Sequence, residues 1–306
     1  MKHACLIMIH NNYEQVWHLL SLLDTDDNDI YVHVDAKSKF EEDDKKYLIS
    51  SVKKAKIHFV QRISVGWGGF SQIRVEQILL SEAVKEYHDY YHLLSGADLP
   101  LKPWKKIDDF FLRNRGKEFV NFMKPDSMKK LQKRSRYYWL FQETIGDPKK
   151  LKQTKNVKKC LLFILQRSFV LLQKTIGINR TKDMPFSCGA NWFSITDDFA
   201  NYVVENEKWV FDTFKNTLCC DEVFLQTLLV NSPYYKNTYR NGEKATWQEA
   251  NQRMVDWGRG RPYVFRKTDY DELVKYPYCF ARKFDWKIDK DIIQLLYEKN
   301  QKEGTL

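Results

Sequence analysis

The N-terminal part of this chain alternates short apolar runs with longer segments whose apolar side chains recur at helical spacing, and this alternation constrains the fold more than any other feature. Residues 13–23, for example, place Val16, Leu19, Leu20 and Leu23 on one face of a helix. Apolar strands separated by such helices form right-handed βαβ units, so we predict an α/β fold with a mostly parallel, Rossmann-like sheet flanked by helices. The expected strands are 4–9, 30–34, 56–60, 90–94 and 118–122, and the expected helices are 13–23, 40–52, 71–87 and 107–113.

The ends of these strands indicate where a ligand binds. In open α/β sheets, ligands lie beyond the carboxyl ends of the parallel strands, which nominates His10, Asp35, Trp67 and the turn at 95–98. Neither of the usual glycine-rich phosphate loops is present, so a nucleotide would be held without a glycine cradle. For Asp35, hydrogen bonding to a nucleotide and ordinary capping of the next helix are about equally favoured by the sequence.

The positive charge of the chain is concentrated in one segment. The 306 residues carry a formal net charge of +10, whereas residues 129–182 alone carry fifteen Lys and Arg against two acidic residues, a net of +13. Within them, residues 160–176 are strongly apolar but include Arg167 and Lys174, which makes them too polar to span a bilayer. A helix on an anionic membrane surface and a helix buried under a basic rim are equally favoured, and nucleic-acid binding is disfavoured.

Cysteines and histidines argue against two further classes of site. None of the six cysteines belongs to a C-x-x-C pair, so we expect buried thiols rather than a disulfide framework. All seven histidines lie within residues 3–92 and five cysteines lie beyond residue 159, which disfavours a zinc cluster. The apolar run 4–9 is too short for a signal sequence or a membrane span, so we expect a cytoplasmic chain, in peripheral contact with the inner face of the plasma membrane through 129–182.

A general base in the second half of the chain has to be a carboxylate, because no histidine follows residue 92. Glu222 is the candidate, since it stands with Asp221 at the start of the apolar stretch 223–229. Capping of that helix by Asp221, with Glu222 supporting its first turn, is the simpler alternative. The D-x-D triplets lie at 24–29, 269–271 and 289–291 and not after a central strand, so we expect no divalent metal.

Seven ordered motifs together resemble the core-2/I-branching β-1,6-N-acetylglucosaminyltransferase family, which also includes peptide O-xylosyltransferases. The resemblance implies a GT-A-like glycosyltransferase fold in one continuous catalytic domain, and the chain looks like a bacterial member. Its expected parts are a nucleotide-sugar-binding half (1–125), a basic helical insertion (126–182) and a catalytic, diphosphate-binding half (183–306). The motifs are IYVHVDAKS (30–38), VGWGGFS (65–71), LLSGADLPL (93–101), FSCGANWFSI (186–195), DEVF (221–224), VDW (255–257) and FARKFD (280–285).

The resemblance also implies roles for individual residues. Glu222 matches the catalytic base, and Lys283 matches a lysine on the donor diphosphate. A second diphosphate cation has to come from Arg259 or Arg261, because the matching position is a glycine. The donor-binding residues are then Ile9, Asp35, Trp67, Ser95, Arg259, Arg261 and Lys283, and the acceptor-binding residues are Arg134, Arg136, Trp192 and Trp257.

The implied function is that of an inverting, metal-independent transferase without a cofactor. The expected donor is UDP-GlcNAc, with UDP-xylose or another UDP-hexose as the alternative. The expected acceptor is a glycan or a lipid-linked oligosaccharide of a bacterial capsule or exopolysaccharide. A non-catalytic scaffold of the same fold, associated with sugar or lipid, is the alternative from a different class of function.

Overall fold

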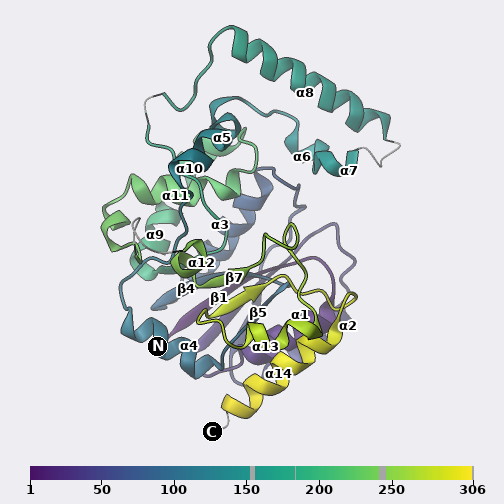
Figure 1. Ribbon diagram of the computed structural model, residues 1–306, viewed down its shortest axis with the longest axis vertical. Helices are drawn as coiled ribbons and strands as arrows, with labels where there is room; N and C mark the ends of the chain where they lie inside the picture. The colour runs from purple at the N-terminus through teal and green to yellow at the C-terminus, as the bar shows by residue number, and fades with distance from the viewer. Residues whose placement is uncertain (152–155, 183, 241–245, 305–306) are drawn as a thin grey trace.

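A five-stranded sheet with the order β3-β2-β1-β4-β6 forms the centre of the computed structural model, which describes residues 1–151, 156–182, 184–240 and 246–304 (Figure 1). The first four strands in the chain run parallel, and the later β6 pairs with β4 in the antiparallel sense. This arrangement confirms the predicted α/β fold and four of the five expected strands. The strands are β1 (His3–Ile9), β2 (Asn28–Val34), β3 (Lys56–Phe59), β4 (Tyr90–Ser95) and β6 (Ser194–Thr196).

Both faces of the sheet are covered by helices, with a separate hydrophobic core on each face. Side chains of β1 alternate between the two cores, since Cys5 and Ile7 enter one and Ala4 and Leu6 enter the other. The first core is closed by α1, α4 and α14, and the second by α3, α9 and α11. These helices are α1 (Tyr13–Leu22), α3 (Ser71–Ala83), α4 (Trp104–Arg113), α9 (Asp197–Glu205), α11 (Phe224–Val230) and α14 (Lys290–Gly304).

A second sheet, with the order β5-β8-β7, joins the two halves of the chain. The buried guanidinium of Arg253 links it to the central sheet, because Nη2 donates to the carbonyls of Leu93 (3.3 Å) and Phe193 (2.5 Å). Burial lowers the pKa of Arg253 to about 10, and its guanidinium lies 5.0 Å from the ring of Phe280. The strands are β5 (Asp98–Pro100), β7 (Arg253–Val255) and β8 (Phe280–Arg282).

The basic segment forms a layer of helices at one end of the molecule, far from both termini in Figure 1. Its longest helix, α8, packs against the short α6. Among the described residues, no helix combines the length and the apolar character needed to cross a membrane. The helices of this layer are α5 (Pro125–Arg136), α6 (Gln142–Ile145), α7 (Pro148–Leu151) and α8 (Val157–Thr175). The remaining helices are α2 (Glu42–Ile49), α10 (Glu207–Phe214), α12 (Trp247–Asn251) and α13 (Tyr270–Leu273).

The structure corrects the prediction in two places. Residues 118–122 form only isolated bridges, Glu118 with Thr238 and Phe119 with Ser194. Another segment of the chain contacts these residues, since the side chain of Asn121 accepts a hydrogen bond from the amide of residue 190. The predicted helix start at residues 221–222 is instead a 3-10 turn, Cys220–Glu222, which precedes α11.

Candidate functional site

The carboxyl ends of β1 and β2 bring three predicted donor-binding residues into one loop cluster. Parallel pairing of the strands lets the Asp35 amide donate to the Ile9 carbonyl at 2.9 Å. The Asp35 carboxylate accepts hydrogen bonds from the amides of Lys37 (2.9 Å) and Val65 (3.3 Å), so it holds the loop that carries Trp67. The indole of Trp67 is 51% exposed and is free to cover a ligand at this edge. Asp35 therefore organises the loops and does not cap α2.

Ser95 ends β4 and begins the turn that leads into β5. The Ser95 amide donates to the carboxylate of Asp98, which is buried. Asp98 pairs with Arg282 across β5 and β8, with 3.5 Å between Oδ1 and Nε. Burial lowers the pKa of Arg282, and its guanidinium lies 3.8 Å from the centre of the Trp192 ring. Trp192, predicted to bind acceptor, is thus stacked on the residue before Lys283, which is predicted to bind the diphosphate.

Lys283 is placed against the same turn by its backbone neighbours. The amide of Phe284 donates to the carbonyl of Ala97 at 2.9 Å, and the amide of Phe265 donates to the carbonyl of Lys283 at the same distance. Gln15 of α1 also donates to the carbonyl of Phe284 at 3.2 Å. Lys283 therefore follows β8 and lies near the carboxyl ends of β1 and β4, where Ile9 and Ser95, two predicted donor-binding residues, are found.

Glu222 and Arg134 are in direct contact, which unites the predicted base with a predicted acceptor residue. Arg134 Nη1 donates to Glu222 Oε2, and the two side chains are 25% and 36% exposed. The carbonyl of Glu222 accepts from the Gly189 amide at 2.9 Å. A Cβ on Gly189 would lie 1.8 Å from the Asn121 carbonyl oxygen, so only glycine allows this approach. Arg136 has a different environment: it is exposed, with its guanidinium 5.8 Å from the ring of Tyr137.

Two buried carboxyl groups lie behind Glu222. Burial raises the pKa of Asp221, and the charge of Glu222 raises it further. Burial also raises the pKa of Glu76 on α3 well above its usual range, with Asp221 adding to the shift. Asp221 Oδ2 accepts from Gln72 Nε2 at 2.9 Å. The pKa of both buried carboxyl groups is therefore raised, and Glu222 is the one of the three whose side chain is partly exposed.

The turn that carries Glu222 and the Trp67 loop are hydrogen-bonded to each other. The Cys219 amide donates to the Gly68 carbonyl at 2.8 Å, and Gln142 Nε2 donates to the Trp67 carbonyl at 3.0 Å. Gln142 belongs to the basic insertion, so three segments far apart in the sequence meet at this loop. The loop of Trp67, a predicted donor-binding residue, and the turn of the candidate base Glu222 are consequently held together by one connected set of hydrogen bonds.

Glu143 also contributes to this set of hydrogen bonds, although the sequence motifs did not predict it. Its carboxylate accepts from the Ser71 amide (2.6 Å) and from the Ser71 hydroxyl (2.7 Å) at the start of α3. A Cβ on Gly69 would lie 2.5 Å from the Glu143 carboxylate, and one on Gly66 would lie 2.3 Å from it. The sequence features that could have indicated Glu143 are the three glycines around Trp67 and the presence of only two acidic residues in the 129–182 segment.

The two candidate diphosphate arginines have different surroundings. Arg259 donates from Nε to Asp256 (2.5 Å) and from Nη1 to Asp269 (2.6 Å), so two carboxylates already engage it. Arg261 is exposed and, among the described residues, has no ion pair or side-chain hydrogen bond. Trp257, predicted to bind acceptor, is 56% exposed nearby in the sequence. Arg261 is therefore the arginine available to an anionic ligand.

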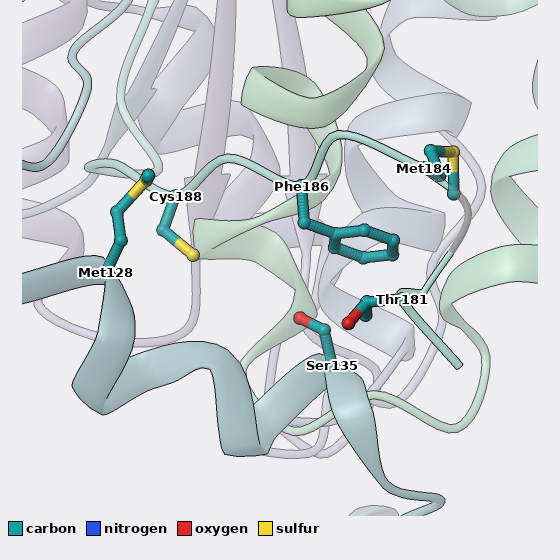
Figure 2. A pocket seen from close by; sticks show the side chains of 6 residues that line it. All are labelled: Met128, Ser135, Thr181, Met184, Phe186 and Cys188. Atoms are coloured by element: carbon teal, nitrogen blue, oxygen red, sulfur yellow. The ribbon is translucent and has the colours of Figure 1, made fainter. Parts of the chain in front are cut away.

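A small cavity lies beside the Arg134 and Glu222 contact, between α5 and the segment that leads to Gly189. Its volume of about 110 Å³ is below the ~300–1,000 Å³ typical of ligand pockets, so it does not accommodate a nucleotide sugar. Figure 2 shows its lining side chains converging from both segments. They are Met128, Ser135, Thr181, Met184, Phe186 and Cys188.

An open α/β sheet with polar and aromatic side chains gathered beyond its parallel strand ends is the architecture of nucleotide-binding α/β enzymes. The family model for the Core-2/I-Branching enzyme matches residues 4–273. The chain belongs to this family of glycosyltransferases, as its motifs predicted, and its fold is the GT-A-like fold expected of it.

Curated relatives of the chain are xylosyltransferases. Rat xylosyltransferase 2 is 24% identical over 97% of this chain and 33% of its own length. The xylosyltransferase sqv-6 of Caenorhabditis elegans is 24% identical over 86% of this chain and 32% of its own length. The chain thus spans about a third of the length of the curated relatives it matches.

Two solved glycosyltransferase structures also align with the chain. The structure of mouse xyloside xylosyltransferase 1 aligns with 92% of this chain over 96% of its own length, with 10% sequence identity and a TM-score of 0.37. The structure of core-mannan synthase A from Aspergillus fumigatus aligns with 74% of this chain over 69% of its own length, with 11% sequence identity and a TM-score of 0.29. At these TM-scores neither alignment adds to the assignment of the family.

The prediction that no divalent metal takes part is corrected. The matched structure of core-mannan synthase A is a Mn/GDP form, so a glycosyltransferase aligned with this chain carries manganese. Metal independence is accordingly withdrawn.

Proposed function

We propose that this chain transfers a sugar from a UDP-sugar to a hydroxyl group of a glycan acceptor, with inversion at the anomeric carbon. The observation that carries the proposal is the position of Glu222. Its partly exposed carboxylate contacts Arg134, and its turn is hydrogen-bonded to the loop of Trp67. A base within reach of both a donor loop and an acceptor-side cation is what glycosyl transfer requires.

In the proposed reaction, Glu222 accepts the proton of the acceptor hydroxyl as its oxygen bonds to the anomeric carbon. The bond between that carbon and the diphosphate oxygen breaks on the opposite face, which inverts the centre. Negative charge then grows on the departing UDP. Lys283 and Arg261 are the cations proposed to stabilise it, and Asp35 and Trp67 are proposed to hold the nucleoside.

Two donor sugars are proposed. UDP-GlcNAc follows from the motifs of the family, and UDP-xylose is supported by the names of the curated relatives, which are xylosyltransferases. Both share the UDP that the proposed donor residues would bind. Hydrolysis and transfer measured with each donor, and with other UDP-hexoses, separate these alternatives.

For the acceptor, we propose a glycan or a lipid-linked oligosaccharide, used on the cytoplasmic side in the synthesis of a bacterial capsule or exopolysaccharide. This part of the proposal rests on the charge of residues 129–182, which suits peripheral contact with an anionic membrane. Transfer to a lipid-linked acceptor with no transfer to the soluble glycan would select the lipid-linked oligosaccharide, and the reverse result would select the glycan.

The test is Glu222→Gln, assayed for UDP binding by calorimetry and for sugar transfer with and without Mn²⁺. We expect unchanged UDP affinity and a ~100- to 10,000-fold fall in kcat. Glu303→Gln is the matched control, because Glu303 is also a cation-paired glutamate with a similar exposure of 35%. Near-normal turnover by the Glu222 variant would contradict the assignment of the base, and UDP binding by the unmodified chain without any turnover would favour a scaffold.

A further inference from the structure

Helix α8 buries polar side chains and exposes apolar ones, the reverse of a helix packed on a soluble protein. Gln166 and Gln173, at 1% and 3% exposure, form its buried contact with the rest of the chain. Gln166 Oε1 accepts from the Phe141 amide (3.1 Å), and Gln173 Oε1 accepts from the Tyr138 amide (2.7 Å). Both Nε2 groups donate to the Tyr138 carbonyl at 3.1 Å. Hydrogen bonds therefore attach this helix to the layer beneath it.

The outward face of α8 is an apolar stripe. Its members recur three, four and seven positions apart, which places them on one side of the helix. Each is at least 47% exposed, and Figure 1 shows the helix at the end of the molecule far from the central sheet. The apolar stripe consists of Val157, Leu161, Ile164, Leu165, Leu171, Leu172 and, just beyond the helix end, Ile176.

The charged side chains of α8 indicate what kind of partner the apolar stripe contacts. The helix contains Lys158, Lys159, Arg167 and Lys174 and no acidic residue. Arg167 and Lys174 lie one heptad apart along one border of the apolar stripe, and Lys158 lies at the other. A second copy of the chain would bring the same positive charges into contact, which is unfavourable, whereas anionic lipid headgroups complement them.

We propose that the apolar stripe of α8 docks into the interfacial region of an anionic lipid bilayer, with its lysines and arginine on the headgroups. This inference specifies the surface for the membrane contact proposed above. It does not depend on sugar transfer, because vesicle binding is measured without a donor. The attachment would place the Trp67 loop near the membrane, since Gln142, which donates to the Trp67 carbonyl, directly follows Phe141, whose amide donates to Gln166 of α8.

The experiment is co-sedimentation of the full chain with vesicles of phosphatidylcholine alone or of equimolar phosphatidylcholine and phosphatidylglycerol. We expect at least about tenfold tighter binding to the anionic vesicles, weakened by salt. The variant L161S/I164S/L171S removes apolar side chains from the stripe, and R167Q/K174Q removes charges from its border. Each should weaken binding by about tenfold or more.

The matched control is I49S/L112S/F211S, which removes three exposed apolar side chains from other helices and should bind like the unmodified chain. Circular dichroism and thermal unfolding confirm that each variant is folded. Failure of the unmodified chain to bind anionic vesicles would overturn the inference. So would equal binding by the L161S/I164S/L171S variant, or a dimer in sedimentation equilibrium that this variant abolishes.

Discussion

A single methyl group on Gly69 should disturb the donor loop through Glu143. The backbone of Gly69 lies outside the left-handed region, so alanine fits its conformation. The added Cβ, however, would lie 2.5 Å from Cδ and Oε1 of Glu143 and 2.7 Å from Oε2. No carbon and oxygen approach so closely without a bond, so the carboxylate has to move away.

The magnitude follows from the hydrogen bonds that the displaced carboxylate loses. It accepts from the Ser71 amide at 2.6 Å and from the Ser71 hydroxyl at 2.7 Å. Hydrogen bonds to charged groups contribute ~1.5–3 kcal/mol when well shielded, but Glu143 is exposed, so we take ~1.5–3 kcal/mol for the pair together. Gly69→Ala and Glu143→Ala should each lower the free energy of unfolding by this amount.

The decisive measurement is a double-mutant cycle, with free energies of unfolding from urea titration. Once Glu143 is alanine, the methyl group at residue 69 has nothing to displace, so G69A/E143A should be about as stable as E143A alone. The coupling energy is then ~1.5–3 kcal/mol. UDP affinity, measured alongside, should fall in both single variants, because the same contact holds the Trp67 loop.

Gly66→Ala is the matched control for the cycle. Its Cβ would meet the Glu143 backbone as well, with 3.0 Å to the carbonyl oxygen and 3.1 Å to Cα. Truncating the side chain of Glu143 should therefore rescue Gly69→Ala but not Gly66→Ala. Simple addition of the Gly69→Ala and Glu143→Ala effects in the double variant would refute the reasoning.

Two further predictions concern pH and the choice of arginine. Burial raises the pKa of Glu118 from an ordinary 4.5 to about 7, so as pH rises through this interval the unfolded chain loses a proton that the folded chain keeps. Stability should fall by about 3 kcal/mol across that interval, and Glu118→Gln should flatten the fall in urea titrations at several pH values. Arg261→Ala should weaken UDP binding by ~10-fold or more at unchanged stability, whereas Arg259→Ala should lower the melting temperature, because Asp256 and Asp269 lose their partner. Calorimetry with UDP and thermal unfolding check both arginines, and the opposite pattern would assign the diphosphate to Arg259.

Much of the central sheet could be predicted because its signals are local. Apolar runs bounded by amphipathic helices identified β1, β2, β3 and β4 and their parallel sense. That sense in turn placed His10, Asp35 and Ser95 at one edge of the sheet. The strand expected at 118–122 failed because Asn121 instead receives the backbone around Gly189, a contact that no periodicity encodes.

The contacts that complete the candidate site join residues far apart in the chain. Ser71 and Glu143 are 72 residues apart, and Arg134 and Glu222 are 88 residues apart. The motifs led to Glu222 and Arg134 separately, but no sequence pattern indicates that the two side chains meet, and none led to Glu143. The same limit applies to α8: its hydropathy pattern shows two unlike faces, but only the structure shows that Gln166 and Gln173 face the protein.

The buried guanidinium of Arg253 fixes the relative positions of two strands that lead to predicted donor-binding residues. Its guanidinium spans carbonyls of Leu93 and Phe193 while stacking on Phe280, two residues before Arg282. The strand that delivers Lys283 is therefore set against the strand that delivers Ser95 when the chain folds. Little rearrangement of these two strands is then needed when charge develops on a ligand near Lys283, and preorganisation of this kind makes fixed charges effective in catalysis.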